Sequence, residues 1–185
     1  MNRTIKELFK VERMFYAPLI PNNTVEGLCD MCMEIVCPDF VIVEIGSFSG
    51  VSSDLLSRFC KELICIDFWE NSIGYVEIPK DMLERAHREF NALAETRPNI
   101  TKVLSTSLIE AEKTPDKSID MVYIDGRHDE DSVRADIKAW LPKVKSGGWV
   151  TGHDIDLGGV QVPVKELLGN NYKSYKDTSW AVQIK

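Results

Sequence analysis

The sequence predicts a single α/β domain in which helices cover both faces of a mostly parallel sheet. Three observations support this prediction. Short apolar runs alternate with helical segments from residue 39 onward, at the spacing typical of strand–helix–strand units. The first run, residues 39–46, is continuous and rich in β-branched residues, as in a strand buried on both faces. The 185 residues also suffice for one domain with a sizeable core, and no linker or repeat interrupts them.

Each expected element follows from this alternation. Strands are expected at residues 39–46, 62–67, 100–105, 118–125 and 147–154, and the C-terminal tail can supply two more. Helices are expected at residues 51–61, 80–96, 108–113, 129–144 and 162–169. A helical region, residues 1–38, precedes this α/β core of residues 39–185. It breaks near residues 17–23, and Thr24 is a good N-cap for its second helix.

The charge of the chain argues against a nucleic-acid partner. The net charge is −7 and the isoelectric point is about 5.0, so the surface repels phosphate backbones. No apolar run reaches the roughly 18–20 residues that span a bilayer, and no signal core follows the N-terminus. We therefore expect a cytoplasmic protein that acts on small molecules and has no membrane partner. Its amphipathic N-terminus could pack on its own sheet or on a second subunit, so a homo-oligomer stays open.

The five cysteines favour free thiols, because an odd number in a chain of cytosolic character does not suggest a disulfide framework. Cys29 and Cys32 are spaced like metal ligands. They fall in a segment of helical periodicity, however, and no second Cys/His pair follows at zinc-finger spacing. We expect structural cysteines there.

The residues directly after each strand are the candidates for function, because ligands of parallel α/β sheets bind beyond the carboxyl ends of the strands. The first strand ends in VEIGSFSG, where Glu44, Gly46, Ser47 and Gly50 lead into a helix. Glycines let the backbone approach a ligand closely, and serine hydroxyls and a helix N-terminus offer hydrogen-bond donors. A plain strand-to-helix turn would also explain this pattern.

Candidate cofactor residues also follow the second and third strands. Asp67 comes 21 residues after Gly46, where an acid can hydrogen-bond the hydroxyls of a ribose; a helix cap or a surface charge is the alternative. Phe68 follows it and can cover a flat ring or pack in the core. Ser107, at the end of the STS segment 105–107, can line an adenine pocket or cap the next helix.

Two of the three histidines follow the fourth and fifth strands. Asp125 and His128 come after the fourth strand, and His153 and Asp154 come at the end of the fifth. Asp125, His153 and Asp154 could therefore converge on one divalent cation. Their carboxylates suit magnesium, whereas an imidazole ligand favours manganese, iron or cobalt. Turn and cap residues without a metal are the alternative. The third histidine, His87, falls among charges in mid-helix and is expected to be solvated.

These motifs resemble those of class I S-adenosylmethionine-dependent methyltransferases. The segments VEIGSFSGVSS, CIDFW, YIDGRHDEDSVRADIKAWLPKVKSGGWVTGHDI and SWAVQIK are similar to a branch of small metal-dependent O-methyltransferases, related to the macrocin and catechol O-methyltransferases. The resemblance covers roughly residues 40–185. It implies a Rossmann-like sheet of seven strands whose last strand is antiparallel.

The resemblance also implies a role for each candidate. The residues that would contact the cofactor are Glu44, Gly46, Ser47, Gly50, Asp67, Phe68, Ser107 and Asp125. A magnesium or manganese ion would be held by Asp125, His153 and Asp154, and His128 would be the general base. Two positions depart from the family pattern: Phe48 stands where the first motif has a middle glycine, and His153 stands where metal-dependent members have a carboxylate.

The expected function is therefore metal-assisted transfer of a methyl group from S-adenosylmethionine to a hydroxyl of a small polar molecule. Two alternatives stay open. His128, His153 and one aspartate could instead form a facial triad for iron(II) chemistry. The domain could also bind the cofactor without catalysis, for which the Phe48 departure is the main support.

Overall fold

The centre of the molecule is a sheet of seven strands, in a computed structural model that describes residues 25–70 and 78–185. The strands are β1 (Val41–Ile45), β2 (Glu62–Asp67), β3 (Ile100–Leu104), β4 (Ile119–Ile124), β5 (Val144–Gly152), β6 (Lys173–Ser174) and β7 (Trp180–Gln183). They lie in the order β3-β2-β1-β4-β5-β7-β6. Strands β1 to β5 pair in parallel, and β7 is antiparallel to β5 and β6. The expected mostly parallel, seven-stranded sheet with an antiparallel last strand is confirmed.

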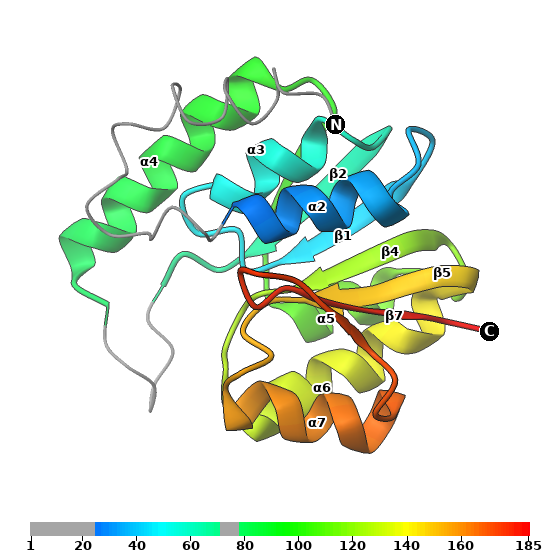
Figure 1. Cartoon of the computed structure of the whole chain (residues 1–185). Coiled ribbons are helices and arrows are strands. Elements are labelled where there is room, and N and C mark those ends of the chain that lie inside the picture. The colour runs from blue at the N-terminus through cyan, green and yellow to red at the C-terminus, as the bar shows by residue number, and fades with distance from the viewer. Residues whose placement is uncertain (1–24, 71–77) are drawn as a thin grey trace.

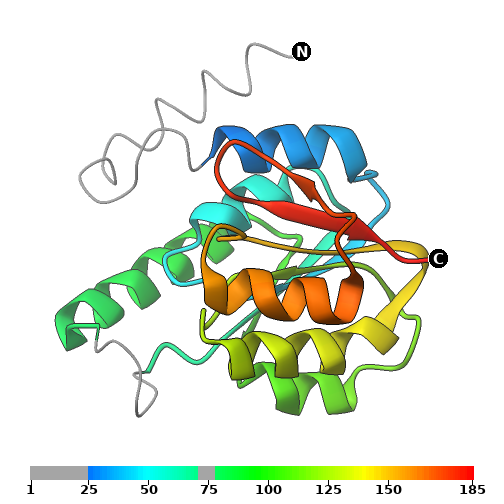
Figure 2. The ribbon, with the colours of Figure 1, turned by 60° about the horizontal axis from the view of Figure 1, so that its bottom comes forward.

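Helices cover both faces of this sheet. They are α2 (Glu26–Ile35), α3 (Val51–Ser57), α4 (Lys80–Thr96), α5 (Ser107–Lys113), α6 (Glu130–Trp140) and α7 (Gly158–Leu168). Helices α2, α3 and α4 lie on one face and α5, α6 and α7 on the other (Figure 1). Figure 2 shows α6 flanked by α5 and α7 in the second layer.

Each face of the sheet has its own hydrophobic cluster. Leu55, Leu63 and Phe90 belong to the cluster under α2, α3 and α4, and Ile137 and Trp140 to the cluster under α6 and α7; all five are fully buried. Because both faces are covered, the central strands need apolar side chains on both sides. This is why residues 39–46 form a continuous apolar run rather than an alternating one.

Several boundaries differ from the sequence-based expectation, among them the end of α3 at Ser57 instead of residue 61 and the start of β5 at Val144 instead of residue 147. Strand β5 ends at Gly152, so His153 and Asp154 lie in the loop after it. Helix α6 ends at Trp140 and continues as a 3₁₀ turn, Leu141–Lys143, because Pro142 lacks the N–H that an α-helix needs. Helix α7 begins at Gly158, four residues earlier than expected.

The expected N-terminal helical region is described only from residue 25 onward, where α2 confirms a helix. The N-terminal turn of α2 is capped by Asp177, a residue distant in sequence, whose carboxylate accepts the Leu28 N–H at 2.5 Å. Cys29 and Cys32 are buried in the core, and the five cysteines are free thiols, as expected. The first expected helix, the break at 17–23 and the Thr24 cap lie outside the described residues. Within the described part of the chain, none of the helices has the length and apolar character needed to cross a membrane.

Candidate active site

A cavity of about 940 Å³ lies at the carboxyl ends of the parallel strands. Its walls include residues that follow β1, β2, β3, β4 and β5. Among the sequence-predicted candidates, these lining residues are Gly46, Ser47, Asp67, Phe68, Ser107, Asp125, His128 and His153. The residues that follow these strands therefore line a single cavity.

The turn after β1 depends on its two glycines. Gly46 has a φ of +83°, and a Cβ built on it would lie 2.2 Å from the backbone oxygen of Asp125. Gly50 has a φ of +84°, and its Cβ would lie 2.6 Å from the Leu93 side chain. A side chain at either position would be strained by the positive φ, and at Gly46 it would also clash with backbone. Gly46 thus brings the turn directly against the loop after β4.

Glu44 is buried inside the sheet and is not among the described residues that line the cavity. Its carboxylate accepts hydrogen bonds from the hydroxyls of Ser47, at 2.8 Å, and of Ser53. Burial raises the pKa of this carboxyl, while the hydroxyl hydrogen bonds oppose the shift. Glu44 therefore supports the turn after β1 from inside the sheet through these hydrogen bonds. The resemblance implied instead that it would contact the cofactor.

Asp67 ties the turn after β1 to the loop after β2. Its carboxylate accepts the Phe48 N–H at 2.7 Å and the Trp69 N–H at 2.8 Å. The Trp69 indole N–H in turn donates to the Phe48 carbonyl oxygen at 2.7 Å. Phe48 has a φ of +44°. The left-handed backbone of a glycine turn is thus retained although the residue is phenylalanine.

His87 is half-buried, whereas the sequence-based expectation was a solvated side chain. Its ring stacks on Trp69, with centroids 4.8 Å apart and planes 14° from parallel. Its Nε2 also contacts the Lys102 ammonium group. Burial, followed by the nearby positive charge of Lys102, lowers the pKa of the imidazole. The sequence did not reveal this contact, because His87 lies on a charged helix and Trp69 lies on a loop that is distant in sequence.

Ser107 lines the cavity and also holds α5 to α6. Its hydroxyl donates to the Asp136 carboxylate at 2.5 Å and accepts from the Trp140 indole N–H at 2.8 Å. Burial raises the pKa of Asp136 to about 6. Asp136 also lines the cavity. Sequence analysis did not select Asp136 as a candidate, because an acid within a charged amphipathic helix is usually a surface residue.

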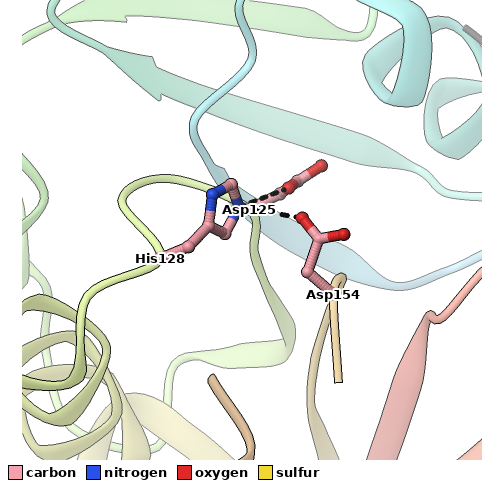
Figure 3. A group of neighbouring side chains, drawn as sticks. All are labelled: Asp125, His128 and Asp154. Atoms are coloured by element: carbon pink, nitrogen blue, oxygen red, sulfur yellow. Dashed lines mark hydrogen bonds and ion pairs between the residues drawn. The ribbon is translucent and has the colours of Figure 1, made fainter. Parts of the chain in front are cut away.

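Asp125, His128 and Asp154 point toward one another across the loops after β4 and β5 (Figure 3). The His128 Nε2 lies 3.0 Å from the Asp154 carboxylate and 3.5 Å from that of Asp125. Hydrogen bonds to these two carboxylates raise the pKa of His128 to about 10. Burial raises the pKa of Asp125, and the two imidazoles hold that of Asp154 well below its usual range.

Backbone packing and a hydrogen bond fix the two loops that carry His128 and Asp154. A Cβ on Gly159, at the start of α7, would lie 2.0 Å from the His128 carbonyl oxygen, so glycine allows α7 to pack against the histidine loop. Asp154 has a φ of +59°, and its N–H donates to the Thr178 hydroxyl at 3.2 Å. The loop before β7 therefore holds Asp154 in its left-handed conformation.

His153 lies next to this cluster. Its Nδ1 is 3.1 Å from the Asp154 carboxylate, and its Nε2 is buried without a hydrogen-bond partner among the described residues. Burial opposes protonation, but the hydrogen bond to Asp154 and the charge of Asp125 outweigh it and raise the pKa of His153 to about 9. One potential ligand atom from each of Asp125, His128 and Asp154 lies within 4.8 Å of the other two. A ligand role for His153 stays a prediction.

The donor set of Asp125, His128 and Asp154 fits a divalent cation. Two carboxylates and one imidazole are ordinary ligands of manganese, iron or cobalt, and carboxylates suit magnesium. Neighbouring ligands of an octahedral ion at about 2.1 Å are roughly 3.0 Å apart. The observed spacings of 3.0 and 3.5 Å around His128 Nε2 are close to this value. The same side chains can therefore pair with one another or share an ion.

The sheet order, the glycine turn after β1 and the acid at the end of β2 are those of a class I, Rossmann-like methyltransferase fold. Residues 43–155 match the family described as the methyltransferase domain, and the chain belongs to this family. An uncharacterized protein of Sinorhizobium fredii, y4gI, is 26% identical over 125 residues. That match covers 63% of this chain and 13% of the relative, so the chain spans a small part of that protein's length.

Solved structures of low sequence identity share the fold. CalS11, a TDP-rhamnose 3′-O-methyltransferase of calicheamicin biosynthesis, is 15% identical with a TM-score of 0.58, over 97% of this chain and 93% of that chain. Fibrillarin from Aeropyrum pernix, with S-adenosylmethionine bound, is 14% identical with a TM-score of 0.55, over 79% and 67%. A Corynebacterium glutamicum protein is 12% identical with a TM-score of 0.61, over 97% and 89%.

Proposed function

We propose that this domain transfers the methyl group of S-adenosylmethionine to a hydroxyl of a small polar molecule, with His128 as the general base. The observation that carries the proposal is the position of His128. Its imidazole lines the same cavity as the Gly46 turn and Asp67, and it contacts the Asp125 and Asp154 carboxylates. The proposed cofactor-binding residues and the proposed proton acceptor thus line one cavity.

The cofactor would bind along the ends of β1, β2 and β3. Gly46, Ser47 and Phe68 line this part of the cavity, where backbone and ring surfaces suit the nucleoside and methionine moieties. Asp67 would accept hydrogen bonds from the ribose hydroxyls through the remaining lone pairs of its carboxylate. Ser107 would border the adenine.

The reaction is an in-line displacement in which the S–CH₃ bond breaks as the O–CH₃ bond forms, and S-adenosylhomocysteine leaves. The domain must hold the acceptor oxygen roughly 3 Å from the methyl carbon and remove its proton. In this proposal His128 takes this proton. With a pKa of about 10, however, its imidazole is already protonated at neutral pH when both carboxylates act on it alone.

Divalent-cation binding is therefore a second part of the proposal. A bound cation lowers the pKa of a coordinated hydroxyl and orients it. Asp125 and Asp154 would hold it, joined by His153 as the resemblance implies, and the His128 imidazole would act as the base beside it. Neutralising these carboxylates weakens their hold on the His128 proton. Proton acceptance by His128 and cation binding are thus coupled.

Two observations support an O-methyl product. One is the similarity to CalS11. The other is the cluster of Asp125, His128 and Asp154, which could hold a cation that coordinates a hydroxyl oxygen. A facial-triad iron enzyme and a non-catalytic binder are the competing functions. Isothermal titration with S-adenosylmethionine, followed by a turnover assay for S-adenosylhomocysteine with hydroxylated acceptors and manganese or magnesium, separates the three. We expect binding and cation-stimulated turnover. Binding without turnover on any acceptor favours the non-catalytic function, and no binding favours the iron enzyme.

A further inference from the structure

We propose that Trp69 is a positioning residue that holds the turn between Gly46 and Gly50 in its cofactor-binding shape, acting through Phe48. This inference rests on the proposed binding of S-adenosylmethionine. It explains how a phenylalanine can occupy a turn position at which the family has glycine. The turn and Trp69 both line the cavity, so a change in one alters the wall that the cofactor meets.

Three hydrogen bonds close a small ring around Phe48. Its N–H donates to one oxygen of Asp67 at 2.7 Å, and its carbonyl oxygen accepts the Trp69 indole N–H at 2.7 Å. The other Asp67 oxygen accepts the Trp69 backbone N–H at 2.8 Å. Both polar groups of the Phe48 backbone are therefore fixed by the loop after β2.

This fixation matters because Phe48 is held in an unfavourable conformation. Its φ is +44° and that of Trp69 is +46°, in the left-handed region that residues other than glycine seldom occupy. Without outside support, a phenylalanine at this position favours an ordinary backbone conformation. The hydrogen bonds from Asp67 and Trp69 supply that support.

Helix α4 makes Trp69 a rigid anchor. The indole stacks on His87 at 4.8 Å and contacts the Phe90 ring at 4.9 Å, and the Lys102 ammonium lies 4.9 Å from its centre. Trp69 is only 7% exposed. Because the indole is packed on these sides, it has little freedom to rotate. Its N–H therefore stays hydrogen-bonded to the Phe48 carbonyl oxygen.

The same helix also supports the far end of the turn. Phe90 and Leu93, on α4, are the nearest neighbours of the space that a Cβ on Gly50 would occupy. Thus α4 reaches Gly50 directly and Phe48 through Trp69. The turn is clamped at two points, and the Phe48 side chain, 39% exposed, is left at the cavity wall.

The test is Trp69→Phe, which removes the indole N–H and keeps an aromatic ring for stacking. Trp149→Phe is the matched control, because Trp149 lies on β5 and not among the cavity-lining residues that the structure describes. The readout is the Kd for S-adenosylmethionine by isothermal titration, with the melting temperature measured alongside. Losing one hydrogen bond should weaken binding about fivefold to tenfold. The control should bind as the wild type does.

Phe48→Gly provides a rescue that a merely structural role of Trp69 would not give. Glycine adopts a positive φ without strain, so the turn no longer needs the indole N–H. In the Phe48→Gly background, Trp69→Phe should weaken binding less than about twofold. His87→Ala, which loosens the anchor without cutting the hydrogen bond, gives a second measurement if Trp69→Phe does not fold. It should weaken binding about twofold to threefold.

The outcomes separate this inference from the proposed function. If the wild type does not bind S-adenosylmethionine, the proposed function fails and the inference fails with it. If the wild type binds and Trp69→Phe binds equally well, only the positioning role is wrong. The same holds if the loss in Trp69→Phe is undiminished in the Phe48→Gly background, or if His87→Ala leaves the Kd unchanged.

Discussion

The His128 imidazole lies between two carboxylates from different strand ends, with Nε2 3.0 Å from Asp154 and 3.5 Å from Asp125. This contact joins the loops after β4 and β5 at the wall of the cavity. In the proposed reaction, this histidine would take the proton of the acceptor hydroxyl. The first predictions test this relationship.

Replacing His128 by alanine should lower kcat by about 10² to 10⁴-fold, the usual contribution of a positioned general base. The Kd for S-adenosylmethionine should stay within about twofold of the wild type, because the turn and Asp67 are untouched. Titration calorimetry and a turnover assay measure the two quantities on the same sample. Unchanged turnover would remove His128 from the mechanism.

Asp154→Asn should weaken the response to manganese. In the wild type we expect the added ion to raise the melting temperature; in the variant, about tenfold more manganese should be needed, because a charged ligand is lost. Asp116→Asn is the control, since Asp116 is a surface acid paired with Lys143. An equal manganese response in all three proteins would show that the cluster is not a cation site.

Asp67→Ala should weaken S-adenosylmethionine binding by at least about tenfold. The variant loses both the proposed ribose contact and the hydrogen bonds to the Phe48 and Trp69 N–H groups. The manganese response should be unaffected, because Asp67 is not among the clustered metal-ligand candidates of the described chain. A lost manganese response in this variant would contradict the separation of the cofactor and cation sites.

Glu44→Gln tests whether Glu44 braces the turn or binds the cofactor. The amide oxygen can still accept from the Ser47 and Ser53 hydroxyls, so we expect the Kd for S-adenosylmethionine to change less than about threefold. Titration calorimetry checks this. A loss greater than about tenfold would instead support the direct contact that the sequence resemblance implied.

Asp136 should make stability depend on pH. Its pKa is raised to about 6 in the folded state from 3.8, so the folded state holds this proton more tightly than the unfolded state does. The free energy of unfolding should therefore fall as pH rises from about 4 to about 7, by up to about 3 kcal/mol, and show little further change from this group above that pH. Asp136→Asn should lack this decline, as measured by urea denaturation across the range. A decline of equal size in both proteins would exclude Asp136 as its source.

The sequence was most informative about the sheet and the strand ends. The apolar runs that form β1, β2 and β4 predicted buried parallel strands, and parallel strands necessarily bring Asp125 and Asp154 to one edge. This reasoning needs only chain direction and strand order. It therefore identified the two acids and His128 without knowledge of any side-chain contact.

The supporting contacts were not predictable in the same way. Asp136 and His87 lie on charged amphipathic helices, and their partners Ser107 and Trp69 are distant in sequence. Periodicity assigns a helix face but does not reveal which loop packs against it. The inward position of Glu44 similarly involves the Ser47 and Ser53 hydroxyls, which donate to one oxygen of its carboxylate.

The most direct test of the account is titration of the domain with S-adenosylmethionine, with and without manganese. The account predicts saturable binding with one cofactor per chain, which Asp67→Ala weakens and His128→Ala leaves intact. An absence of binding in both conditions would contradict it.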